Sequence, residues 1–171
     1  MVIFVMGLPG SGKSYFAARL AELTAAVCIN SDRVRKELLP DTRYTEEEKL
    51  MVYDEMLRLA KGSVTDRRPV VLDATFYTRD IRDTFTRALQ ELDEIVFIEV
   101  VADEELVRER LRRPREDSDA NFEVYLEIKE EWEPLQDEHL VLRSTDENID
   151  SMLDEAMEYL QHGMYDRRAG R

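Results

Sequence analysis

The sequence has only one cysteine, Cys28, among its 171 residues, so no disulfide can form within the chain. Long apolar runs are also missing: the longest, residues 2–6 and 95–102, are far shorter than a membrane span. The N-terminus has neither the basic leader nor the small-residue cleavage site of a signal peptide. These absences lead us to expect a cytoplasmic protein without a membrane partner.

Positive charge is scarce. The chain has 24 Lys and Arg against 38 Asp and Glu, which gives a net charge of −14. Such a chain repels nucleic acid overall, although a local basic cleft remains compatible with it. We therefore expect nucleic acid only as a 5′-end substrate, and no sequence feature indicates an obligate protein partner.

Short apolar runs alternate with segments of helical periodicity. Strands are expected at residues 2–6, 26–30, 70–74, 95–101 and 139–142. Helices are expected near residues 13–23, 32–39, 45–61, 81–92, 104–113, 122–132 and 149–160. This alternation predicts an α/β fold, in which a parallel sheet is covered by helices on both faces and ligands bind at the carboxyl ends of the strands.

Local signals place some helix ends and the domain boundary. Thr45 and Ser144 each begin a capping-box pattern, and Gly62 follows the expected end of the helix that Thr45 opens. We expect one domain over residues 1–162 and a loose C-terminal tail over residues 163–171.

A complete phosphate-binding loop follows the first strand and precedes a helix. The pattern G-x-x-x-x-G-K-[ST] is satisfied by Gly7, Leu8, Pro9, Gly10, Ser11, Gly12, Lys13 and Ser14. Glycine backbone N–H groups and the helix N-terminus bind phosphate, Lys13 adds a positive charge, and Ser14 offers a hydroxyl to Mg²⁺. The chain lacks the Asn-Lys-x-Asp signature of guanine binding. We therefore expect ATP and Mg²⁺ at this loop.

Acidic residues follow two of the other expected strands. Asp32 comes after the second strand and is the candidate base for an acceptor hydroxyl, with Arg35 three residues further as an acceptor contact. Asp73 ends the third strand, where it would bind Mg²⁺ directly or through water, and it is also the rival for the base role. The alternatives are that Ser31 or Asp32 only caps a helix and that Asp73 is an ordinary strand-terminal acid.

Arginines crowd the helix expected at residues 104–113 and the polar loop after it. Arginine from a lid can neutralise charge in phosphoryl transfer, and Arg110 and Arg113 share one helical face. The alternative is a solvated face in which arginines pair with glutamates of the same helix.

These motifs together resemble the small AAA-type P-loop kinases. The resemblance covers roughly residues 1–143 and rests on the phosphate loop, Asn30-Ser31-Asp32-x-x-Arg35, Val-Leu-Asp73-Ala-Thr, and an Arg-rich lid that ends at residues 118–120. Similar proteins are polynucleotide 5′-kinases, gluconate kinases and zeta toxins. The resemblance implies a five-stranded parallel sheet of order 2-3-1-4-5, Asp32 as base, Arg35 on the acceptor, Asp73 near the metal, and lid arginines on the γ-phosphate. The lid is short, and its arginines do not align uniquely with those of the family.

The sequence therefore predicts a Mg²⁺-dependent kinase that transfers the γ-phosphoryl of ATP to a hydroxyl. The acceptor stays open between a small molecule, such as a sugar or nucleoside, and a nucleic-acid 5′-OH end. Two alternatives are a nucleotide-dependent ATPase or switch protein without a phosphoacceptor, and a toxin-like kinase of sugar nucleotides. The pair Asp32 and Arg35 favours the kinase over the switch protein, because a switch protein has no acceptor hydroxyl that a base must deprotonate.

Overall fold

The computed structural model describes residues 1–39, 41–43, 45–113 and 120–169, with side chains up to residue 162. Five parallel strands form one sheet in the order β2-β3-β1-β4-β5. They are β1 (Val2–Met6), β2 (Val27–Asn30), β3 (Val70–Asp73), β4 (Ile95–Val101) and β5 (Leu140–Arg143). This confirms the predicted order 2-3-1-4-5 and the parallel sheet.

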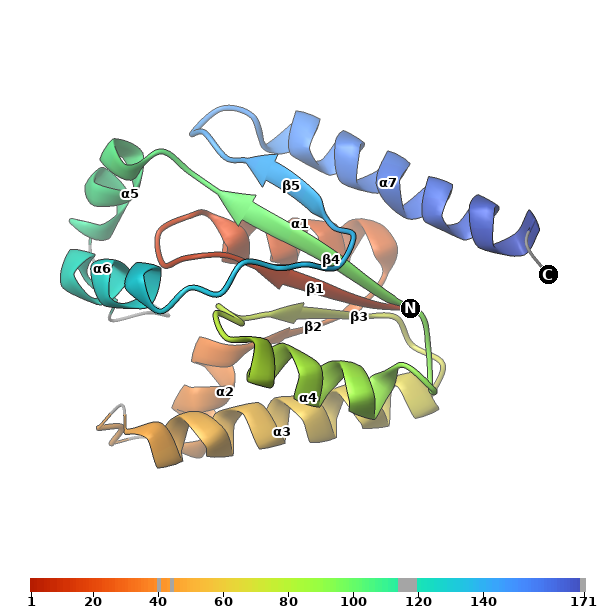
Figure 1. The fold of residues 1–171 in the computed structure, drawn as a ribbon, viewed down its shortest axis with the longest axis horizontal. Coiled ribbons are helices and arrows are strands. Elements are labelled where there is room, and N and C mark those ends of the chain that lie inside the picture. Colours follow the sequence, from red (N-terminus) through yellow and green to blue (C-terminus); the bar gives the residue numbers. More distant parts are fainter. Residues whose placement is uncertain (40, 44, 114–119, 170–171) are drawn as a thin grey trace.

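Seven helices accompany the sheet in the described part of the chain. They are α1 (Lys13–Thr24), α2 (Ser31–Leu38), α3 (Glu46–Thr65), α4 (Arg79–Leu89), α5 (Glu104–Leu111), α6 (Phe122–Glu130) and α7 (Ile149–Ala169). Helices α1 and α7 cover one face of the sheet, α3 and α4 cover the other, and α5 and α6 lie beyond the carboxyl ends of the strands (Figure 1). None of the described helices has both the length and the apolar character that crossing a bilayer requires.

The two faces of the sheet bury different side chains. Beneath α3 and α4 lies an aromatic cluster in which the ring of Phe4 is 4.8 to 6.0 Å from those of Phe76, Phe85 and Phe97. Beneath α1 and α7 the core is mainly aliphatic. The central strand β1 is buried along its whole length because both faces are covered, which explains its uninterrupted apolar sequence. This rigid strand leads directly into the phosphate loop.

The structure corrects three predicted helix ends. Helix α3 begins with the predicted capping box at Thr45, but it runs past Gly62 to Thr65 because its buried face continues through Val64. The last helix begins at Ile149 and has no capping box at Ser144, whose hydroxyl accepts a hydrogen bond from Arg110 instead. The backbone of α7 continues to Ala169, so it includes residues 163–169, for which the sequence predicts a loose tail.

A buried arginine fixes the chain that leaves α6. The guanidinium of Arg82, on α4, donates to the carbonyl oxygens of Phe76 and Glu133, in each case at 2.8 Å. The Glu133 N–H in turn donates to the Tyr77 carbonyl at 2.9 Å. Burial lowers the pKa of Arg82, although a guanidinium so far from its titration range stays charged. These bonds hold the C-terminal end of α6 against the loop after β3.

Candidate active site

The phosphate loop occupies the turn between β1 and α1, as predicted. Gly10 and Gly12 have φ angles of 79° and 93°, which side-chain-bearing residues rarely adopt. A Cβ atom on Gly10 would lie 2.9 Å from the Val107 side chain, so this part of the loop packs tightly against α5. Because α1 begins at Lys13, the free N–H groups of its first turn are positioned for an anion.

A cavity of about 670 Å³ opens beside the loop, at the carboxyl ends of β2 and β3. Its walls come from the phosphate loop, α1, β2, α2, α3, the end of β3 and α6. The lining residues used below are Lys13, Ser14, Asn30, Asp32, Arg35, Lys49, Tyr53, Asp73, Tyr77, Val124 and Ile128. The structure thus brings the predicted base, the predicted acceptor contact and the predicted metal ligands to one cavity.

Asp73 is the most buried acid of the site, with 1% of its surface exposed. Its Oδ2 accepts a hydrogen bond from Asn30 Nδ2 at 2.5 Å, and its Oδ1 is buried without a hydrogen-bond partner. Burial raises the pKa of this carboxyl, while the positive charge of Lys13 and the hydrogen bond from Asn30 oppose the rise. A buried carboxylate oxygen with spare acceptor capacity is suited to a cation.

Mg²⁺ fits these residues. It usually keeps several waters and takes one or two protein oxygens plus substrate phosphates, which matches the Ser14 hydroxyl and the Asp73 carboxylate in one cavity. The described residues contain no cluster of three or more His, Cys, Asp or Glu that could hold a metal by themselves. The donor set therefore suits a metal that arrives with a nucleotide.

Asp32 and Arg35 lie on α2, one turn apart. Asp32 is in the first turn, half-buried, and Arg35 is half-buried in the last turn. Both side chains line the cavity, and both influence the pKa of Tyr53, which burial raises. The helix is capped by the side chain of Asn30 and by neither Ser31 nor Asp32, so the capping alternative for Asp32 is wrong.

The two lid arginines singled out from the sequence have different surroundings. Arg110 donates through Nη1 to the carbonyls of Gly10 and Ser11, at 3.3 and 3.2 Å, and to Ser144 Oγ at 3.1 Å. Its Nη2 pairs with Asp146 Oδ1 at 2.9 Å. Arg113 is exposed, and neither arginine lines the cavity among the described residues. Arg110 thus binds backbone carbonyls of the phosphate loop. The contacts of Arg110 and Arg113 with the γ-phosphate stay predictions.

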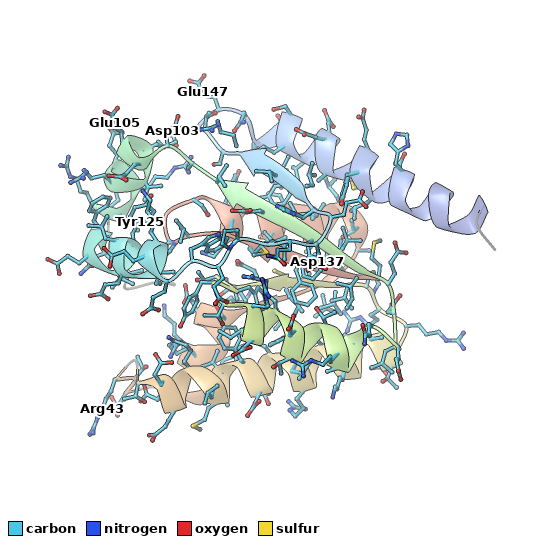
Figure 2. The ribbon with its side chains drawn as sticks, viewed as in Figure 1. Arg43, Asp103, Glu105, Tyr125, Asp137 and Glu147 are labelled. Carbon is cyan, nitrogen blue, oxygen red and sulfur yellow. The ribbon has the colours of Figure 1, made fainter. Side chains whose placement is uncertain are left out.

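Arg108 and a lysine–glutamate pair join α5 to α6. The guanidinium of Arg108 lies 3.9 Å from the centre of the Phe122 ring on α6, and Lys129 pairs with Glu104 at 2.8 Å. Tyr125 lies between α6 and α5, with its ring 5.2 Å from that of Phe122 (Figure 2). Arg108 Nη2 also lies 3.6 Å from Glu104 Oε1, one turn earlier on the same helix, so the solvated, paired alternative holds for Arg108. The polar loop of the predicted lid, residues 114–119, lies outside the described residues.

The different surroundings of Arg110 and Arg113 give a test with a matched pair of variants. Arg110→Ala should lower the free energy of unfolding by about 1 to 3 kcal/mol, because it leaves buried carbonyls of the phosphate loop without a charged donor. Arg113→Ala should stay within about 0.5 kcal/mol of the parent, because that side chain is exposed. Urea unfolding of the ligand-free protein measures both. Equal losses in the two variants would contradict this assignment.

Sequence reasoning missed several residues that line the cavity. Lys49 Nζ donates to the Tyr77 hydroxyl at 2.6 Å and pairs with Glu46 at 2.7 Å. Burial lowers the pKa of Lys49, but these two hydrogen bonds outweigh it and the net change is a rise. Val124, Glu127 and Ile128 line the cavity from α6. Spacing on α3 and α6 gives no signal for these roles, since they depend on how the helices dock.

The sequence and the fold were then compared with known proteins. Residues 2–135 match the family model AAA_33, an AAA domain. The chain belongs to this AAA domain family. A search of curated proteins finds no match. The family assignment confirms the predicted resemblance to small AAA-type P-loop proteins.

Solved structures of kinases share the fold of this AAA domain. A gluconokinase from Sinorhizobium meliloti is 19% identical, with a TM-score of 0.70 over 97% of this chain and 96% of that one. A sugar kinase from a Janibacter species is 14% identical, with a TM-score of 0.70 over 94% of each chain. The Mycobacterium tuberculosis APS kinase, in complex with AMPPNP and APS, is 16% identical, with a TM-score of 0.69 over 94% of this chain and 96% of that one. At such identities the likeness shows the fold alone.

Proposed function

We propose that this AAA domain is a Mg²⁺-dependent kinase that transfers the γ-phosphoryl group of ATP to a hydroxyl of an acceptor. The observation that carries the proposal is the cavity, in which Asp32 of α2 shares one space with Lys13, Ser14 and Asp73. A nucleotide-binding loop alone would serve a switch protein equally well. A carboxylate in the adjoining acceptor space is what a kinase needs in addition.

Each part of the cavity has a role in this reaction. The backbone N–H groups of the loop and the Lys13 ammonium hold the β- and γ-phosphates, and Ser14 and Asp73 would hold Mg²⁺. When bound, the metal neutralises charge on the transferred group. Asp32 accepts the hydrogen bond of the attacking hydroxyl and then its proton, while Arg35 orients the acceptor. Helix α6 lines one side of the cavity.

A small molecule is the acceptor that the cavity favours. About 670 Å³ is the size of a small-molecule site, and α6 lines it with apolar Val124 and Ile128 beside Glu127. The chain carries a net charge of −14, which disfavours a long polyanion beyond a single 5′ end. Exposed carboxylates such as Asp103, Glu105 and Glu147 stand around α5 and the loop before α7 (Figure 2). The neighbours named as a sugar kinase and a gluconokinase support a polyhydroxylated acceptor.

The rate of ADP formation tests the proposal against the ATPase alternative. ATP, Mg²⁺ and the protein are mixed with sugars and sugar acids, nucleosides, nucleotide sugars or 5′-hydroxyl oligonucleotides, and ADP is followed by a coupled assay. A kinase is expected to form ADP faster with one acceptor class than without any acceptor. A slow rate that no acceptor class changes would favour the ATPase or switch. Omission of Mg²⁺ should stop the reaction in either case.

A further inference from the structure

Asn30 uses both ends of its side-chain amide at the centre of the site. Its Oδ1 accepts the N–H of Arg33 at 2.8 Å and so caps α2, the helix that carries Asp32 and Arg35. Its Nδ2 donates to Asp73 Oδ2 at 2.5 Å. Only 9% of Asn30 is exposed, and it pairs with Asp73 in the register of β2 and β3. One side chain therefore touches both the helix of the candidate base and the candidate metal ligand.

The two hydrogen bonds fix the amide in one orientation. A backbone N–H can only be met by the amide oxygen, so the NH₂ group must face the carboxylate. With Oδ2 held in this way, Oδ1 of Asp73 is the oxygen left without a hydrogen bond, in the cavity that Ser14 also lines. Partners of this kind orient a ligating carboxylate, and their loss typically costs about 10- to 100-fold in metal affinity or activity.

We propose that Asn30 is a positioning residue that sets Asp73 for Mg²⁺ and, through the cap of α2, holds Asp32 in register with it. The proposal rests on the proposed function for the role of the metal, but its geometry is independent of the acceptor. This role explains why residue 30 has an amide side chain. Aspartate would cap the helix equally well but would set two carboxylates against each other, and serine would cap it without reaching Asp73.

Two variants distinguish the hydrogen bond that Asn30 donates to Asp73 from the hydrogen bond with which it caps α2. Asn30→Asp and Asn30→Ser both keep an N-cap oxygen, so α2 should stay capped, and both lose the amide donor to Asp73. Each should raise the Mg²⁺ concentration for half-maximal phosphoryl transfer by about 10- to 100-fold. The KM for the acceptor should change far less, because the cap of α2 is retained. A purely structural role would lower the melting temperature without moving the Mg²⁺ requirement.

The matched control is Asn121→Asp. Asn121 caps α6 in the same way, since its Oδ1 accepts the Val124 N–H at 3.0 Å, but it is exposed and is not among the described residues that line the cavity. This variant should keep the Mg²⁺ requirement of the parent. The double variant Asn30→Asp with Asp73→Asn restores one acid and one amide. It should recover the melting temperature lost in Asn30→Asp, and it should not recover Mg²⁺ affinity, because the carboxylate is then on the wrong strand.

A binding measurement makes the outcome independent of catalysis. The melting temperature of each protein is followed with AMPPNP while Mg²⁺ is titrated. The proposal expects the midpoint of the Mg²⁺ titration to rise in both Asn30 variants and to stay unchanged in Asn121→Asp. A parental midpoint in folded Asn30→Asp or Asn30→Ser would overturn it. If no acceptor is phosphorylated by the parent, the proposed function fails, and these midpoints still decide the role of Asn30.

Discussion

Asp32→Ala is expected to lower the rate of phosphoryl transfer to the acceptor by about 10²- to 10⁴-fold, the usual contribution of a general base. The side chain lines the cavity from the first turn of α2 and lies outside the phosphate loop. ATP binding depends on the loop and on Lys13, so the dissociation constant for ATP should change little. The measurement pairs steady-state transfer with calorimetric ATP binding.

Two further variants sharpen this test. Asp32→Asn keeps the shape of the side chain and removes its charge, so it should lose nearly as much activity as Asp32→Ala. Lys13→Ala should lower both ATP affinity and rate, because its charge acts on the phosphates in every state of the reaction. Near-normal turnover in Asp32→Asn would show that another group takes the proton, and Asp73 is the other acid in the same cavity.

Asp73→Asn is expected to have opposite effects on function and on the stability of the ligand-free protein. Loss of the carboxylate should lower the rate of Mg²⁺-dependent phosphoryl transfer by about 100- to 1,000-fold. This is the usual loss when one group that stabilises charge in the transition state is removed. Burial raises the pKa of Asp73 in the folded state, so the folded protein holds this proton more tightly than the unfolded chain. Protonation of Asp73 therefore adds to the free energy of unfolding. This contribution is complete below the pKa that Asp73 has in the unfolded chain, and it is lost as the pH rises through the pKa that Asp73 has in the folded protein.

The pH dependence of unfolding measures this effect. As the pH rises from the ordinary aspartate pKa of about 3.9 through the raised pKa of the folded state, the parent should lose stability relative to Asp73→Asn, by about 1.4 kcal/mol for each unit of pKa difference between the folded and unfolded states. Asp154→Asn removes one acid from the exposed face of α7 and controls for the change in net charge. Parallel pH profiles of the parent and Asp73→Asn would contradict the raised pKa. Addition of Mg²⁺ and AMPPNP should stabilise the parent more than Asp73→Asn.

The parts of the site that are local in sequence could be predicted. The phosphate loop is contiguous, and the strand and helix that flank it are visible as an apolar run and a helical repeat. Asp32 and Arg35 follow one strand and Asp73 ends another, and the carboxyl ends of parallel strands meet at one edge of the sheet. The strand order came from the resemblance to the family, because alternation of strands and helices leaves the order open.

The parts that depend on docking could not be predicted. Arg110 and Arg113 share a face by spacing, but α5 packs against Gly10 through Val107, and this turns Arg110 toward the phosphate loop and leaves Arg113 exposed. Ser144 matched a capping box, yet its hydroxyl bonds to Arg110, and that partner comes from a different part of the chain. Asn30 meets Asp73 only because β2 and β3 pair in this register.

The central claim is that a hydroxyl acceptor receives the γ-phosphoryl group of ATP in this cavity, and the fate of a γ-label tests it most directly. The protein, Mg²⁺ and γ-labelled ATP are incubated with each acceptor class, and the label is separated into free phosphate and phosphorylated acceptor. The account predicts that label accumulates on a small hydroxylated molecule and that Asp32→Asn abolishes this product. Label recovered only as free phosphate with every acceptor, at the same rate in the parent and in Asp32→Asn, would contradict it.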